Sequence, residues 1–262
     1  MENANQIKNI VKEKYGEIAK AQGEKSCCGS SKVVDYTMFQ DSYDNLEGHV
    51  QDADLGLGCG LPTEVAGIKT GDTVLDLGCG AGNDVFVART LVGNDGKVIG
   101  LDMTEDMIEL AEKNNRKLGF GNVEFRLGEI EKMPVEDDSI DVVISNCVLN
   151  LVPDKEKSFA EIYRVLKSGA HFCVSDIVIE GELNEELKKS AEMYAGCVAG
   201  AIQKDEYLGI IEKAGFKNVD VAKSKTITLP DHLLQKYLDD ESLADYKNRE
   251  IGIFSITVKA EK

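Results

Sequence analysis

The most regular hydrophobic pattern in the chain begins at Thr73. From there, apolar runs of about 4–8 residues alternate with segments of helical spacing, which is typical of a parallel sheet with helices on both faces. These runs predict strands at Thr73–Leu77, Lys97–Leu101, Val123–Leu127, Ile140–Ser145 and Ala170–Ile177. The segments between them predict helices at Asp84–Val92, Glu105–Leu118 and Lys155–Leu166. The middle of the chain is therefore expected to form an α/β unit.

Residue types at the helix ends sharpen this interpretation. Thr104 precedes the second predicted helix and is a residue type that caps helix N-termini, while Gly119 stands where it can end that helix. Gly169 is expected to break the chain soon after the third helix.

Weaker patterns flank this unit. Apolar residues at helical spacing in the first twenty positions predict an amphipathic helix packed on the main domain. After the fifth strand we expect a helix through the 180s and 190s, a helix at Lys204–Ala214, a strand near Val219 and a last strand at Ile253–Ala260. The acidic segment Pro230–Glu250 is either a lid or a surface insertion. The chain is thus divided into an N-terminal helix and loop (1–60), a core (61–180) and a C-terminal part (181–262).

The composition of the 262 residues narrows the partners. The apolar content of 42% suits a globular protein. No apolar stretch reaches the ~18 residues of a membrane span, and the charged, helix-patterned start lacks the apolar core of a signal peptide. The chain is therefore expected in the cytoplasm and away from membranes. A net charge of −17 repels phosphate backbones, so nucleic acid is excluded as an expected partner.

The seven cysteines change the picture further. An odd number in a chain without a secretory signal indicates free thiols and not a disulfide framework. Cys79, within a glycine-rich turn, and Cys173, inside the fifth predicted strand, are interpreted as small or core residues. The other cysteines need a chemical explanation.

A candidate cofactor site follows the first predicted strand. The strand runs into Asp76-Leu77-Gly78-Cys79-Gly80-Ala81-Gly82, at the edge of the sheet where open α/β folds bind ligands. Asp102 lies at the end of the next strand, 26 positions after Asp76. A carboxylate at this place can accept hydrogen bonds from both ribose hydroxyls of a nucleoside cofactor. Asn83 stands where a dinucleotide motif would have its third glycine. The pattern therefore favours a nucleoside cofactor other than a dinucleotide.

The stretch VLDLGCGAGND resembles motif I of the class I S-adenosylmethionine methyltransferases. The resemblance implies a Rossmann-like fold with a mostly parallel seven-stranded sheet, helices on both faces, an N-terminal helix and loop, and a small C-terminal extension. It also implies S-adenosylmethionine as cofactor. The cofactor residues that it implies are Asp76, Gly78, Cys79, Gly80, Asp102 with Met103, Glu129 and Ile130 at the adenine, and Asn146 beside Cys147 at the methyl-transfer pocket.

The acceptor has to be inferred from residues outside the cofactor motif. Cys59 lies in the glycine-dense loop LGLGCGLP, where Pro62 is expected to begin a short helix, and Cys197 lies in MYAGCVAGA. Both segments can reach over the carboxyl edge of the sheet. Soft thiolates select thiophilic centres such as trivalent arsenic, whose lone pair attacks a methyl group without a general base. Such a base would be hard to find, because His49, His171 and His232 lie in no evident motif.

The segments around these cysteines, together with SNCVLNLVPDK, FSITVKAEK and SCCG at 26–29, resemble arsenite S-adenosylmethionine methyltransferases over nearly the whole chain. The resemblance implies Cys59 and Cys197 as catalytic arsenic thiols, with Cys27 or Cys28 as a further N-terminal thiol. Many family members have another arsenic-binding cysteine beyond the position of Cys197, but none follows it here. The third ligand is therefore left open among Cys27, Cys28, solvent and an external thiol.

The resulting hypothesis is a detoxifying methyltransferase that takes arsenite or its thiol adduct, with a thiol reductant as partner. Two alternatives remain open. A C-methyltransferase acting on a quinone or a related apolar acceptor would share the cofactor motifs, but an aromatic content of 6% without Trp does not suggest an aromatic-lined pocket. A non-catalytic sensor of arsenic or S-adenosylmethionine would use the same groups without transferring the methyl.

Overall fold

The computed structural model describes residues 4–23, 42–44, 46–181, 200–227 and 252–262. Its strands are β1 Thr73–Leu77, β2 Lys97–Asp102, β3 Val123–Leu127, β4 Ile140–Asn146, β5 Leu166–Glu180, β6 Lys217–Ile227 and β7 Gly252–Glu261. Its helices are α1 Ala4–Gly23, α2 Pro62–Val65, α3 Asn83–Val92, α4 Glu105–Leu118, the 3-10 turn η2 Leu149–Leu151, α5 Lys155–Val165 and α8 Lys204–Lys213. Within these ranges no helix combines the length and hydrophobicity needed to cross a membrane.

The strands form one seven-stranded sheet in the order β3-β2-β1-β4-β5-β7-β6. The pairs from β3 to β5 are parallel, and β7 runs antiparallel between β5 and β6. The order reverses between β1 and β4, which leaves a crevice outside their carboxyl ends. The mostly parallel seven-stranded sheet expected from the resemblance is confirmed.

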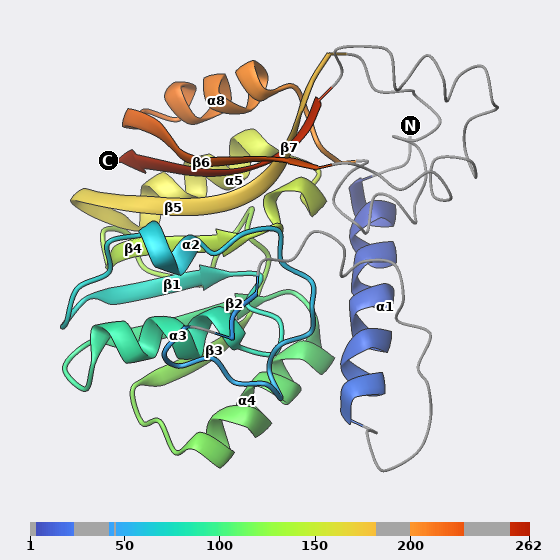
Figure 1. Cartoon of the computed structure of the whole chain (residues 1–262), viewed down its shortest axis with the longest axis vertical. Helices are drawn as coiled ribbons and strands as arrows, with labels where there is room; N and C mark the ends of the chain where they lie inside the picture. Colours follow the sequence, from blue (N-terminus) through green and yellow to red (C-terminus); the bar gives the residue numbers. More distant parts are fainter. Residues whose placement is uncertain (1–3, 24–41, 45, 182–199, 228–251) are drawn as a thin grey trace.

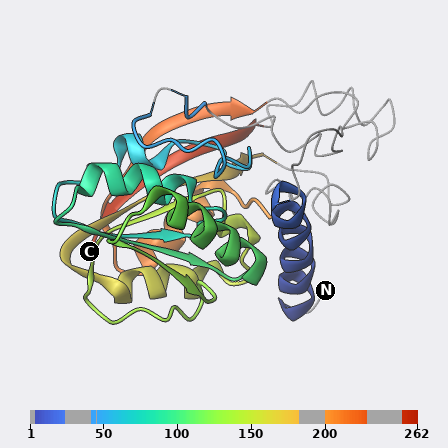
Figure 2. The same cartoon turned by 90° about the horizontal axis from the view of Figure 1, so that it is seen from below.

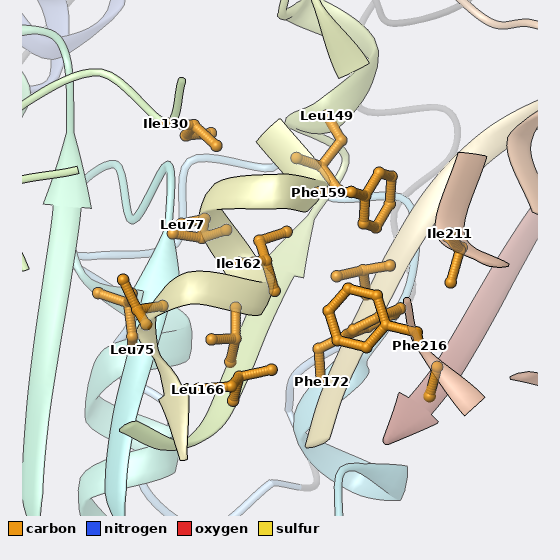
Figure 3. Close-up of a cluster of buried hydrophobic side chains, with 14 of the residues drawn as sticks. Leu75, Leu77, Ile130, Leu149, Phe159, Ile162, Leu166, Phe172, Ile211 and Phe216 are labelled. Atoms are coloured by element: carbon orange, nitrogen blue, oxygen red, sulfur yellow. The ribbon is translucent and has the colours of Figure 1, made fainter. Parts of the chain in front are cut away.

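Successive side chains of β1 point to opposite faces of the sheet, and both faces are buried. Leu75 and Leu77 join the core cluster beneath α5 and α8, whereas Val74 joins the cluster beneath α3. Figure 3 shows part of the first cluster, in which Phe159 and Ile162 from α5 face Phe172 from β5. Because successive strand residues point to opposite faces, these apolar runs require helices on both sides.

Helix α1 lies across the carboxyl edge of the sheet. In Figures 1 and 2 it stands beyond the arrowheads of β1 and β4, close to α4. Its Lys20 forms an ion pair with Asp106 of α4 at 3.1 Å. The predicted N-terminal helix is confirmed, and its position makes it a cover for the crevice.

The predicted elements agree with the structure apart from details at their ends. Thr104 occupies the N-cap position of α4, but its side chain makes no capping hydrogen bond, because it is turned towards Asp102. Gly119 ends α4 in the left-handed conformation, as expected. Gly169 does not separate α5 from the strand, since β5 begins at Leu166 and passes through the left-handed Gly169, whose N–H donates to the Lys262 carbonyl at 3.1 Å.

Several predictions concern residues outside the described ranges. These are the helix in the 180s and 190s, the segment Pro230–Glu250, and the cysteines Cys27, Cys28 and Cys197.

Candidate active site

The turn after β1 brings backbone N–H groups to the carboxyl edge of the sheet. Gly78 has a φ of +67°, and a Cβ on it would lie 2.5 Å from the side chain of Val148. A larger residue would therefore be strained in its backbone and would collide with the chain after β4. Gly78 and Cys79 both donate to the Leu101 carbonyl, at 2.7 and 3.0 Å, which ties the turn to β2.

Asp102 at the end of β2 is held by backbone donors. Its Oδ2 accepts from the Gly80 N–H at 3.0 Å, and its Oδ1 accepts from the Thr104 N–H at 2.9 Å. Burial raises the pKa of this carboxyl, and the N–H donors partly oppose that rise because they favour the charged form. The Asp102 carboxylate is thus fixed next to the glycine turn before any ligand arrives.

A pocket with an empty volume of about 1080 Å³, including solvent at its mouth, opens beside this turn. Its wall combines α1, the loop before α2, the glycine turn, the end of β2, the chain after β3 and the chain after β4. Of the predicted cofactor residues, the wall contains Asp76, Gly78, Cys79, Gly80, Asp102, Met103, Ile130 and Asn146. The structure therefore brings residues from four strand ends to one place.

Glu129 is the predicted cofactor residue with the most surprising surroundings. Its carboxylate lies 2.8 Å from the Lys8 ammonium of α1, and the same ammonium reaches Glu131 at 3.0 Å. Glu131 is buried and lines the pocket next to Ile130. The pair with Lys8 lowers the pKa of Glu129. The adenine role of Glu129 stays a prediction, and α1 now shares that corner of the pocket.

A group of hydrogen-bonded polar side chains lines the pocket: the buried Tyr43 and Asp84 and the half-buried Asn146. The Tyr43 hydroxyl donates to Asp84 Oδ2 at 2.9 Å. The Asn146 amide donates to the Tyr43 oxygen at 2.7 Å, to the Gly60 carbonyl at 2.8 Å and to Asp84 Oδ2 at 3.2 Å. Asn146 therefore connects the pocket wall to the loop that contains Cys59.

Cys59 is placed by the same network. Its N–H donates to Asn146 Oδ1 at 3.0 Å, and its carbonyl accepts a hydrogen bond from Ser255 of β7. The residue is 1% exposed. Gly60 packs against β5 so closely that a Cβ on it would lie 2.6 Å from Ser175 Oγ. The backbone of Cys59 is thus fixed next to the carboxyl end of β4, and the residue is buried there.

The structure adds a second thiol at this place. Cys147 directly follows β4, is 4% exposed and lines the pocket. Its φ of +62° is unusual for a side chain other than glycine, and its N–H is tied to the Ser175 carbonyl at 2.7 Å. Strained non-glycine residues of this kind cluster at functional sites. Sequence reasoning placed Cys147 at the methyl-transfer pocket but did not count it among the arsenic thiols.

Cys59 and Cys147 both act electrostatically on one buried hydroxyl, that of Tyr207. Tyr207 of α8 donates to Asp176 at 3.3 Å. The pKa of Tyr207 is raised well above its usual value, first by burial, then by Asp176, with further contributions from both Cys59 and Cys147. Cys59 and Cys147 therefore both lie within electrostatic reach of the Tyr207 hydroxyl.

The remaining described residues from the sequence analysis are one further cysteine and two histidines. Cys173 is fully buried on the α2 side of the sheet with its thiol 3.4 Å from the Pro62 carbonyl, which confirms it as a core residue. His49 pairs with Asp54 at 3.1 Å, and His171 contacts the Ala66 carbonyl. Within the described ranges no three side chains of the metal-ligating types converge on one point. Among the described residues, Cys147 on the pocket wall and Cys59 in the loop tied to Asn146 are the two thiols considered for the acceptor.

The residues around the pocket fit S-adenosylmethionine. Asp102 offers a carboxylate for the ribose hydroxyls, and Met107, Ile130 and Val152 offer apolar surface for a base. Asp76 and Asp84 are buried carboxylates on the pocket wall, so a ligand with positive charge suits them. The ribose, the base and the positive charge of the cofactor thus each have a matching feature in the wall.

Fold and pocket together define a class I S-adenosylmethionine-dependent methyltransferase. A family model described as a methyltransferase domain matches residues 68–215, which agrees with this assignment.

The relatives narrow the class to a family. The chain is 37% identical to an arsenite methyltransferase of Halobacterium salinarum, over 98% of the chain and 67% of that protein. It is 34% identical to the arsenite methyltransferase of Mus musculus, over 91% of the chain and 65% of that protein. A crystal structure of CrArsM, an arsenic(III) S-adenosylmethionine methyltransferase from Chlamydomonas reinhardtii, matches with a TM-score of 0.67 and 36% identity, over 78% of this chain and 67% of that one.

The chain belongs to the arsenite methyltransferase family. It spans about two thirds of the length of these relatives.

Proposed function

We propose that this chain transfers the methyl group of S-adenosylmethionine to trivalent arsenic held by its own thiols, as a step in arsenic detoxification. The observation that supports this acceptor is a pair of buried thiols: Cys147 on the wall of the cofactor pocket, and Cys59 in the loop that Asn146 ties to that wall. Thiolates bind soft, thiophilic centres, and two of them on one arsenic leave its lone pair free. The acceptor is thus a small molecule, and the net charge of −17 argues against nucleic acid.

The chemistry requires little from the protein beyond placement. When bound, S-adenosylmethionine supplies an electrophilic methyl group on a positively charged sulfur. The arsenic lone pair forms the arsenic–carbon bond while the carbon–sulfur bond breaks and leaves its electron pair on sulfur. The positive charge passes to arsenic, which becomes pentavalent. One sulfur ligand then leaves arsenic as half of a disulfide with a thiol reductant, a proton is released, and arsenic keeps the electron pair and is trivalent again.

Placement is the task of the Asn146 network. Asn146 fixes the Cys59 N–H on one side and contacts Tyr43 and Asp84 on the other, so the acceptor loop and the cofactor wall cannot shift independently. A misplacement of ~1 Å can reduce rate by about 100-fold, which makes such a link valuable. Trivalent arsenic bonds to three sulfurs, so one further thiol joins Cys59 and Cys147. We assign it to Cys197, with Cys27, Cys28 and an external thiol as the alternatives. The reducing cytoplasm keeps these thiols free.

No proton has to be removed from a trivalent arsenic acceptor, and neither histidine of the described ranges lines the pocket. His49 is engaged by Asp54, and His171 by the Ala66 carbonyl. The arsenite methyltransferase relatives, which match over 98% and 91% of the chain, favour arsenic over both alternatives from the sequence, a C-methyltransferase for an apolar acceptor and a non-catalytic sensor.

The test is incubation with labelled S-adenosylmethionine, arsenite and a small thiol, followed by mass spectrometry of the products. We expect methylated arsenicals and an equal amount of S-adenosylhomocysteine. Absence of methylarsenic from protein that binds S-adenosylmethionine normally would overturn the proposal. Replacing arsenite by a quinone acceptor tests the C-methyltransferase alternative in the same assay.

A further inference from the structure

Asp84 has a role in the pocket that the cofactor motif does not explain. It stands in the first turn of α3, two residues after the glycine turn, and is only 8% exposed. Its Oδ2 accepts hydrogen bonds from Tyr43 and Asn146. Its Oδ1 is buried and has no hydrogen-bond partner within the described part of the chain. A buried carboxylate oxygen without a partner on a pocket wall indicates that the ligand provides one.

The charge around Asp84 points to a cation. Asp76, also buried and on the pocket wall, lies close enough for Asp84 to raise its pKa, after burial as the main cause. The charge of Asp54 likewise raises the pKa of Asp84. No ion pair with Lys or Arg reaches Asp76 or Asp84 in the described ranges. A positive ligand would therefore gain more here than a neutral one.

The position of Asp84 indicates which positively charged group of the ligand lies beside it. Asn146 contacts Asp84 with its amide nitrogen and the Cys59 N–H with its oxygen. Asp84 thus lies at the boundary between the cofactor pocket and the thiols. For transfer in line, the sulfur that bears the methyl group must lie at this boundary.

We propose that Asp84 recognises the positive sulfonium of S-adenosylmethionine and thereby distinguishes the cofactor from S-adenosylhomocysteine. This inference rests on the methyl donor and not on arsenic as the acceptor. When the methyl group leaves, sulfur keeps the bonding electron pair and becomes neutral, so its attraction to Asp84 is lost. The product then binds more weakly than the cofactor and leaves the pocket for the next turnover.

The experiment is a comparison of binding constants by isothermal titration calorimetry at pH 7.5, without arsenic. Asp84→Asn keeps the size of the side chain and removes its charge. We expect it to weaken S-adenosylmethionine about tenfold and S-adenosylhomocysteine less than twofold, because only the former carries the sulfonium charge. The control Asp52→Asn makes the same change of net charge at an exposed carboxylate and should alter neither constant.

Two results would overturn the inference. Equal weakening of both ligands would assign Asp84 to the ammonium group, which both ligands carry, and no change in either would remove Asp84 from cofactor recognition. Because arsenic is absent, neither result bears on the proposed acceptor. Circular dichroism of each variant verifies that it has folded.

The wild-type chain offers a second measurement that needs no variant. Burial raises the pKa of Asp84 to about 6, opposed by hydrogen bonds from Tyr43 and Asn146. Affinity for S-adenosylmethionine should therefore rise between pH 5 and pH 7, as Asp84 ionises, while affinity for S-adenosylhomocysteine changes less. The other titratable groups around Asp84 are Tyr43, Asp54 with its partner His49, Asp76 and Cys173. Parallel pH profiles for the two ligands would contradict the inference.

Discussion

The cofactor side and the thiol side of the pocket are built in different ways. On the cofactor side, backbone groups of one turn are tied to the next strand, as in the bonds from Gly78 to the Leu101 carbonyl and from Gly80 to Asp102. On the thiol side, distant segments meet, since Cys59 and Cys147 come from different loops that the Asn146 side chain joins. Backbone geometry therefore shapes the proposed donor site, and side-chain contacts shape the proposed acceptor site.

This difference teaches which changes should separate the two halves of the reaction. A variant on the thiol side should remove transfer and leave cofactor binding intact, because the turn does not depend on the thiols. A variant on the cofactor side should mainly weaken the binding of S-adenosylmethionine. Variants on each side test whether cofactor binding and methyl transfer can be separated, and the largest expected effect comes first.

The largest effect is expected for Cys147→Ser, which exchanges the second thiol for a hydroxyl. We expect arsenic methylation to fall roughly 100-fold or more, since oxygen is a poor ligand for a soft centre. The dissociation constant of S-adenosylmethionine should stay within about twofold. The matched control is Cys173→Ser, which makes the same change at a buried cysteine outside the pocket wall. Full activity of the Cys147 variant would remove this thiol from the site.

On the cofactor side, Asp102→Asn is expected to weaken S-adenosylmethionine by about 30-fold, the size of a lost hydrogen bond to a charged group. The measurement is calorimetric titration. Asp141→Asn is the control, because Asp141 also accepts a backbone N–H, that of Thr73 at 2.9 Å, but lies at the start of β4. An unchanged binding constant for the Asp102 variant would contradict its ribose role.

Asp176 gives a pH-dependent effect on stability near the thiol side. Burial raises its pKa to about 7, with Lys155 and the Tyr207 hydroxyl as the facing groups that favour the charged form. Unfolded Asp ionises near its usual 3.8, so the folded state binds more protons between the two values. The folded state therefore loses stability through this group as pH rises from about 4 to 7.

Asp176→Asn should remove this loss. We expect its melting temperature to exceed that of the wild type by roughly 4 °C at pH 8, and the difference to shrink towards pH 4. Thermal melts followed by circular dichroism at several pH values measure it. A difference that is constant with pH would show that the charge of Asp176 is not the cause.

The smallest effect concerns α1, which covers the cofactor side. Lys8→Gln removes the ion pairs with Glu129 and Glu131 and should weaken S-adenosylmethionine about threefold, with a loss that diminishes in high salt. Lys20→Gln, on the same helix but paired with Asp106, is the matched control. If both variants behave alike, the contact of Lys8 with the pocket has no special role.

The cofactor side could be predicted from the sequence because its signals are local. A buried strand, the glycine turn and a carboxylate at the next strand end follow one another within Thr73–Asp102, and register then brings them together. Glu129 shows the limit of such reasoning. The ammonium that pairs with the Glu129 carboxylate belongs to Lys8, 121 positions away, so no local sequence pattern predicts the contact.

The thiol side was only partly predictable for the same physical reason. Glycine-rich surroundings drew attention to Cys59, but Cys147 sits in an apolar segment where a cysteine is usually a core residue. Its position directly after β4, at the edge where ligands bind, is the signal that could have found it. Asp84 was missed because a carboxylate in the first turn of a helix is common there, where it suits the helix dipole.

The most direct test of the central claim, arsenic held by Cys59 and Cys147, is X-ray absorption spectroscopy at the arsenic edge on protein loaded with one equivalent of arsenite. In the wild type, sulfur should fill the arsenic coordination shell. Cys59→Ser and Cys147→Ser should each lose one sulfur neighbour, while Cys173→Ser keeps the full set. A shell that is unchanged in both pocket variants, or that contains mainly oxygen in the wild type, would contradict the account.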